Sequence, residues 1–145
     1  MAASGNYKAG GDINPSRLVV RNGDSFTVTQ GADNSASFAG VSQEGTRQPP
    51  GVTGSSALAA SSGEPLHVYG DGEECLLTLS GASSVTYNQG DLIGSDSVGM
   101  GEKITPANDD SGVVYYAGVL QEDGVGGEKR RFLVQPGIYV NYNAA

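Results

Sequence analysis

Tryptophan is absent from this chain, and cysteine and histidine occur once each, at Cys75 and His67. A single cysteine excludes an internal disulfide framework and a cysteine-based zinc site. One histidine leaves little of the acid–base and metal-binding chemistry for which proteins most often use imidazole. These absences favour a binding or structural role, and we predict that the chain is not an enzyme and needs no cofactor.

Positive charge and long apolar runs are also scarce. Eight Lys and Arg residues face sixteen Asp and Glu residues, for a net charge of −8. A net-negative surface repels the phosphate backbone, so we expect no nucleic-acid partner. No apolar run approaches the roughly 18 residues that span a membrane, and residues 1–16 lack the apolar core of a signal peptide. We therefore expect no membrane partner and synthesis in a cytoplasm.

Glycine is abundant: it supplies 23 of the 145 residues, more than twice the average share of about 7%. Apolar residues come in short runs between turn residues, and Asn22-Gly23 predicts a hairpin joining 17–21 to 26–29. Many short strands at this spacing predict an all-β single domain, a small β-barrel or β-sandwich. The other predicted strands are 37–42, 66–69, 75–79, 85–87, 92–93, 113–121, 131–134 and 138–142.

Two segments do not fit the body of such a barrel. Residues 1–16 are poor in apolar groups and predict an extended N-terminal arm, which leaves 17–145 as the barrel domain. Residues 44–64 form a long loop, and loops of that length are usually functional or flexible. The loop is either a solvated excursion or a segment that reaches a neighbouring subunit, with one turn of helix possible at 57–60.

One short pattern occurs twice. An aromatic residue, Ala-Gly-Val, a variable residue and Gln-Glu stand at 38–44 and again at 116–122. A small Ala-Gly pair suits a strand position where another backbone passes closely. Both a duplication and a shared strand geometry explain the repeat, and shared geometry is the simpler explanation.

Motifs for catalysis and ligand binding are missing. The Gly-rich stretch 124–129 lacks the Gly-Lys-Ser/Thr ending of a phosphate-binding loop, and the carboxylates do not follow the EF-hand pattern. The basic residues form two groups, one near the arm and one at 129–131. Such groups either dock on an acidic partner surface or protect sheet edges from aggregation.

A family resemblance comes from several short segments in order. The string at 38–51, FAGVSQEGTRQPPG, resembles a segment common in the head decoration (capsid cement) proteins of tailed bacteriophages. The segments 63–70, 90–96, 116–122 and 134–137 follow in the same order, so the resemblance covers roughly residues 13–140. It implies a β-barrel-like virion protein on the outer capsid surface, often trimeric, whose partner is the major capsid protein.

The resemblance transfers no individual contact residue, so the candidates are chosen from this sequence. Tyr7 and Ile13 are the sizeable apolar residues of the predicted arm, and basic residues suit an acidic shell surface. The candidate capsid contacts are Tyr7, Lys8, Ile13, Arg17, Arg21, Arg47, Lys129 and Arg130. The alternative functions are a carbohydrate- or host-surface-binding β module and, with less support, a small β-barrel enzyme.

Overall fold

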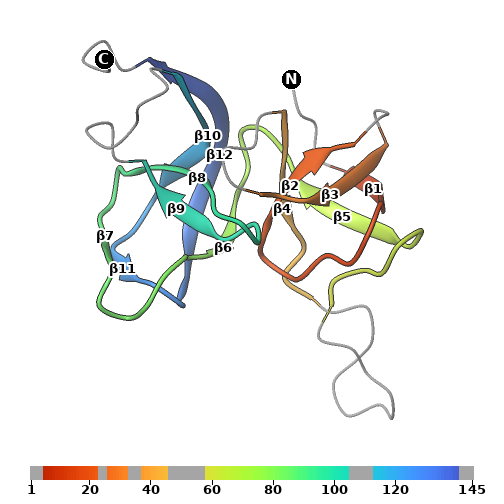
Figure 1. The fold of residues 1–145 in the computed structure, drawn as a ribbon, viewed down its shortest axis with the longest axis horizontal. Helices are drawn as coiled ribbons and strands as arrows, with labels where there is room; N and C mark the ends of the chain where they lie inside the picture. Colours follow the sequence, from red (N-terminus) through yellow and green to blue (C-terminus); the bar gives the residue numbers. More distant parts are fainter. Residues whose placement is uncertain (1–4, 23–25, 33–36, 46–57, 105–112, 141–145) are drawn as a thin grey trace.

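The computed structural model of the chain describes residues 5–22, 26–32, 37–45, 58–104 and 113–140. These residues form two β-bodies that follow one another along the chain and lie side by side (Figure 1). The first body holds strands β1 to β5 and the second holds β6 to β12. The prediction of an all-β, barrel-containing fold is confirmed.

The first body is a closed five-stranded barrel in the order β1-β3-β2-β4-β5. Antiparallel pairing of β1 with β5 closes it. The predicted hairpin is confirmed, because β2 and β3 pair antiparallel around a turn whose residues 23–25 lie outside the described ranges. The strands are β1 (Gly5–Ala9), β2 (Leu18–Arg21), β3 (Thr27–Gln30), β4 (Phe38–Ser42) and β5 (Pro65–Tyr69).

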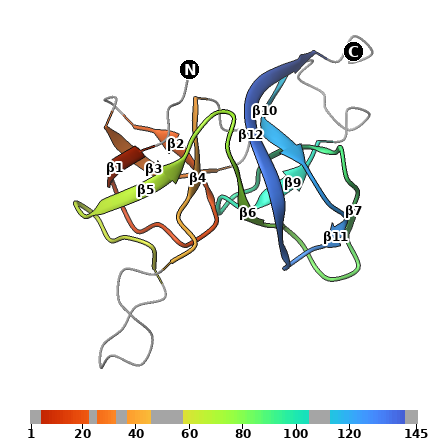
Figure 2. The same ribbon diagram turned by 180° about the vertical axis from the view of Figure 1, so that it is seen from behind.

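The second body contains a five-stranded sheet in the order β6-β12-β10-β8-β9 and a two-stranded sheet of β11 and β7. Seen from behind, β12 is the long curved strand of this body (Figure 2). The strands are β6 (Glu74–Thr78), β7 (Thr86–Tyr87), β8 (Leu92–Ser95), β9 (Gly101–Lys103), β10 (Val113–Leu120), β11 (Gly124–Val125) and β12 (Lys129–Val140).

The prediction of an extended arm is wrong for the described part of residues 1–16. Residues Gly5–Ala9 form β1, which pairs with β3 on one side and β5 on the other. Ile13 is fully buried in the barrel and bridges to Ala60. The segment has few apolar groups of its own, but its neighbours supply both the backbone partners and the rest of the core.

The prediction of two separate strands at 131–134 and 138–142 is wrong. They belong to one strand, β12, up to Val140. Pro136 has no N–H group to donate to a neighbouring strand. The strand tolerates it because the pairing of β12 with β10 is irregular at this point and the pairing with β6 extends only to Leu133. The short strands β1, β9 and β11 were not predicted.

The end of the predicted long loop belongs to the barrel core. Residues 46–57 lie outside the described ranges. Beyond them, Ala59 and Ala60 are buried, and the N–H groups of both donate to the Ile13 carbonyl. The helical turn predicted at 57–60 is wrong for 58–60, because Ala60 forms a β-bridge to Ile13.

The repeated Ala-Gly pair lies at close backbone approaches in both bodies, as predicted. A Cβ atom on Gly40 would lie 1.8 Å from the Tyr69 carbonyl oxygen, and one on Gly118 would lie 2.0 Å from that of Leu133. Ala39 and Ala117 are fully buried, and the strand register shifts at both places. Shared strand geometry therefore accounts for the pattern without a duplication.

The buried residues form two hydrophobic clusters, one within the barrel and one that the two bodies share. Strand β4 is buried along its whole length: Ala39 faces the barrel interior, whereas Phe38 and Val41 pack with residues of the second body. Backbone hydrogen bonds cross the same junction, from Leu18 N–H to the Gly99 carbonyl at 2.8 Å and from Thr78 N–H to the Ser16 carbonyl at 3.0 Å. The relative position of the two bodies is therefore set by packing and by backbone bonds.

Candidate functional site

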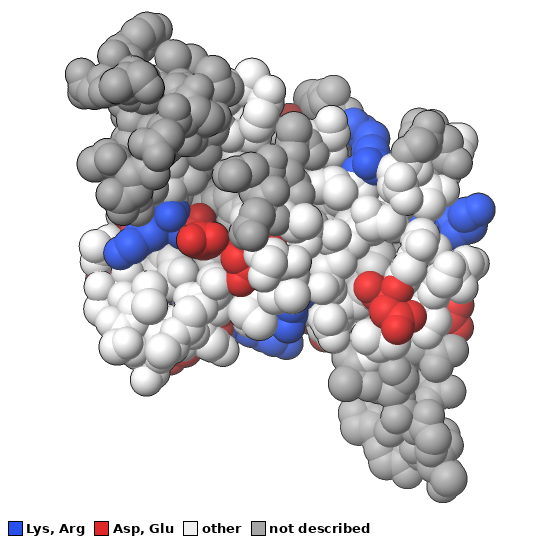
Figure 3. All heavy atoms as spheres, in the orientation of Figure 1, with Lys and Arg blue, Asp and Glu red and all other residues white. Residues whose placement is uncertain are grey.

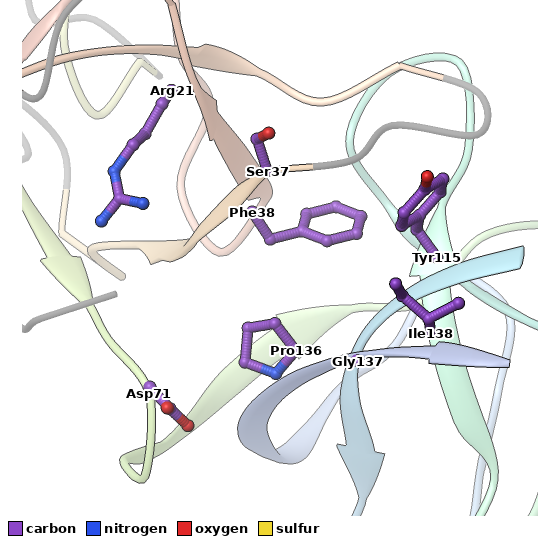
Figure 4. A pocket seen from close by; sticks show the side chains of 8 residues that line it. All are labelled: Arg21, Ser37, Phe38, Asp71, Tyr115, Pro136, Gly137 and Ile138. Carbon is purple, nitrogen blue, oxygen red and sulfur yellow. The ribbon is translucent and has the colours of Figure 1, made fainter. Parts of the chain in front are cut away.

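A groove of about 320 Å³ lies where the two bodies meet (Figure 4). Strands β2 and β4 contribute one side and β10 and β12 the other, with the turn after β5 at one end. Its lining residues are Arg21, Ser37, Phe38, Asp71, Tyr115, Pro136, Gly137 and Ile138. The groove therefore exists only while both bodies are packed together.

One end of the groove is polar. Arg21 ends β2 and Asp71 lies in the turn between β5 and β6, and both residues line this end of the groove (Figure 4). The guanidinium offers only donors and the carboxylate only acceptors. No ion pair within 4.0 Å joins these two side chains, so this end offers a donor group and an acceptor group that are not paired with each other.

The other end of the groove is apolar and partly open to solvent. Tyr115 and Ile138 are directly opposite each other on β10 and β12, and they are 39% and 58% exposed. The Phe38 ring and Pro136 lie between this pair and the polar end (Figure 4). These two side chains leave this end of the groove open to an apolar ligand surface.

The predicted contact residues do not converge on one surface. Ile13 is in the barrel core and is unavailable as a surface contact, which corrects its choice as an arm anchor. Tyr7 is half-buried and packs against the same core, whereas Lys8, next to it on β1, is exposed. Of the seven candidates that the structure describes, only Arg21 lines the groove.

Arg17 serves the junction between the bodies. Its guanidinium donates from Nη1 to the Val98 carbonyl at 2.9 Å. Burial lowers the pKa of this guanidinium from its ordinary value, and the negative charge of Asp96 opposes that shift. A half-buried arginine held across the junction contributes to packing of the two bodies more than to an outer contact surface.

The basic run at 129–131 is partly neutralised by the chain itself. Arg130 forms a 2.8 Å ion pair with Glu128, and Arg131 lies 3.5 Å from a carboxylate oxygen of Glu122. Lys129, at the start of β12, is exposed. Arg47 lies outside the described residues. On the face drawn in Figure 3, basic and acidic side chains form small separate groups without a broad basic patch.

Within the described ranges, no three His, Cys, Asp or Glu side chains are grouped so as to hold a metal ion. Among the same residues there is no helix long and apolar enough to cross a membrane.

No protein-family model and no curated protein matches the chain. Among solved structures, it is similar to the N base of the head fiber gp8.5 of bacteriophage phi29. The TM-score is 0.54 at 14% sequence identity, and the match covers 93% of this chain and 95% of the other. The chain shares its fold with a head-fiber base. The likeness extends over both β-bodies, because it includes nearly the whole of each chain.

Sequence reasoning chose Arg21 for its charge, as a capsid contact, and did not predict that Phe38, Asp71, Tyr115 and Ile138 line a groove with it. Asp71 stands in a Gly-Asp-Gly turn, where an aspartate needs no functional explanation. Tyr115 and Ile138 belong to ordinary alternating strands, and only their partial exposure in the folded chain distinguishes them. No local pattern in the sequence carries that information.

Proposed function

We propose that the chain is a non-catalytic virion structural protein that binds the outer surface of an icosahedral phage capsid and stabilises neighbouring major capsid proteins. The observation that carries the proposal is the fold shared with the phi29 head-fiber base over nearly the full chain. The ordered resemblance to head decoration proteins supports the same location from independent features of the sequence. Both lines of support concern proteins of the phage head.

Stabilising a shell requires contacts and no reaction. A stable interface typically buries about 800 Å² per partner, a modest part of the 7304 Å² surface of this chain. Several contacts on one rigid body strengthen each other, because the second forms at high effective concentration once the first is made. We further propose that the chain self-associates on the shell, with a trimer favoured, since each added copy multiplies the contacts.

Among the basic candidates that the structure describes, Lys8 on the barrel and Lys129 on the second body are the exposed ones. They lie on different bodies, so neutralising each in turn tests which body faces the shell. We expect Lys8→Gln or Lys129→Gln to weaken attachment, mainly at low salt, because exposed charges act chiefly through long-range steering. The matched Lys→Arg variants keep the charge and should retain binding.

The decisive experiment adds purified protein to heads assembled from the major capsid protein of the same phage but lacking this chain. Bound copies are counted as protein concentration rises, and the heat resistance of the heads is measured. We expect saturation at a copy number set by the icosahedral symmetry, together with heads that open at higher temperature. Binding that never saturates, or no binding at all, would refute the proposal.

A further inference from the structure

The groove between the two bodies carries polar groups that the fold itself does not use. The Arg21 guanidinium, the Asp71 carboxylate and the Tyr115 hydroxyl have no hydrogen bond or ion pair to another described residue. Ser37 adds a further hydroxyl to the lining, from the start of β4. Asp71 is exposed and Tyr115 is 39% exposed, so these groups are open to a ligand. Here they gather around one cavity.

The same cavity has an apolar wall with an exposed aromatic ring. Tyr115 and Ile138 stand side by side, and Phe38 and Pro136 continue the wall toward the charged end (Figure 4). The volume of about 320 Å³ lies at the lower end of the 300–1,000 Å³ range typical of small-molecule sites. The groove therefore suits a compact ligand with one apolar face and several hydroxyl groups.

We propose that this groove binds a neutral saccharide of one or two sugar units, a function beyond attachment to a shell. The C–H face of a sugar ring packs against an aromatic ring such as Tyr115. Hydroxyls of the sugar donate to the Asp71 carboxylate and accept from the Arg21 guanidinium. One positive and one negative group at the same end offset each other, so a neutral ligand suits them better than a charged ligand of either sign.

The test begins with the full chain on an array of glycans, followed by calorimetric titration with the mono- or disaccharide that the bound glycans share. Tyr115→Ala removes the ring, and Asp71→Asn removes the acceptor charge while keeping its shape. Each should weaken saccharide binding by about tenfold or more. Binding by the unaltered chain should change little between low and high salt, because the ligand is neutral.

Two control variants match these changes away from the groove. Phe26→Ala removes a ring that is 71% exposed on the barrel, and Asp12→Asn neutralises another exposed aspartate. Neither residue lines the groove, so both variants should bind the saccharide as the unaltered chain does. Circular dichroism and thermal melting check the folding of every variant. If Tyr115→Ala does not fold, Asp71→Asn and Tyr115→Phe serve instead, the latter removing only the hydroxyl.

The proposal is overturned if no glycan binds at millimolar concentration. It is also overturned if the groove variants bind the saccharide with the same affinity as the unaltered chain. It is equally overturned if those variants weaken attachment to heads while the unaltered chain binds no saccharide, because the groove is then a contact with a shell protein. Saccharide binding that persists in a chain unable to bind heads would reject only the capsid function. The two proposals therefore fail independently.

Discussion

At the scale of single residues, Gly40 and Gly118 are the least tolerant of a side chain among the glycines whose surroundings the structure describes. Both lie where a neighbouring strand's carbonyl oxygen would meet a Cβ atom at 2.0 Å or less, and Gly40 also has φ of +150°. A methyl group there must push two paired strands apart. These glycines are therefore required by close packing of backbones, whereas most glycines at turns serve local conformation.

We predict that Gly40→Ala and Gly118→Ala each lower the free energy of unfolding by about 2–4 kcal/mol. Gly11→Ala is the matched control, because a Cβ atom there meets nothing within 4 Å. It should change stability by no more than about 0.5 kcal/mol. Urea denaturation followed by circular dichroism measures all three, and equal stability of the three variants would contradict the packing argument.

Cys75 gives the stability a dependence on alkaline pH. Burial, reinforced by the negative charges of Glu44, Glu73 and Glu74, raises the pKa of its thiol from 9.0 to about 12. The folded chain thus holds this proton at pH values where the unfolded chain has lost it. The stabilisation is fully present below pH 9 and is lost as the pH rises toward 12.

We therefore expect the free energy of unfolding of the unaltered chain to fall between pH 9 and pH 12 more steeply than that of Cys75→Ala. The substitution also costs some stability at all pH values through lost packing, but that loss does not depend on pH. Tyr87, whose pKa is also raised to about 12, contributes equally to both chains. Parallel stability curves from urea titrations across this pH range would show that the thiol is not responsible.

At the scale of elements, β1 decides whether the barrel is closed. It joins β3 to β5, and the chain beyond it places Ile13 in the core. Without β1, both neighbouring strands would present free edges, which are prone to pair with other chains.

Deleting residues 1–9 should therefore lower the thermal midpoint and promote aggregation, whereas deleting residues 1–4 alone removes no residue of β1. Ile13→Ala should cost about 2–5 kcal/mol for the cavity it leaves. Thermal melting with light scattering compares the two deletions. If the longer deletion melts like the shorter one, β1 does not close the barrel in solution.

At the scale of the whole molecule, the shared core makes the two bodies one cooperative unit. Leu18 belongs to a barrel strand yet packs in the cluster that contains Leu77, Ile93 and Phe132 of the second body. Interfaces between independent domains are usually more polar and allow relative motion. An apolar junction crossed by backbone hydrogen bonds resists it.

We predict a single calorimetric unfolding transition for the unaltered chain. Leu18→Ala should move that one transition to lower temperature, at a cost of about 2–5 kcal/mol, without splitting it. Val98→Ala, a substitution at a side chain that is 43% exposed, is the control and should leave the midpoint nearly unchanged. Two separate transitions in the unaltered chain would mean that each body folds alone.

The sequence by itself determined the all-β class, the β2–β3 hairpin and the two close backbone approaches at Ala-Gly. These features depend on turn residues and on alternation within a few positions, which local pattern reports well. It also led to Arg21, though for its charge and not for its place in a groove.

Only the tertiary structure decided the rest. By sequence, residues 5–16 resemble an extended arm. In the structure, β1 pairs with β5, which lies far along the chain, and Ile13 is fully buried. Pro136-Gly137 is typical of a turn, but in the structure the strand continues through it because β10 pairs with β12 on both sides, with an irregular register between. The groove requires Arg21, Asp71 and Tyr115 to meet from three distant segments. Long-range pairing and packing place these residues, because the free energy that holds them comes from partners that no local window of the sequence contains.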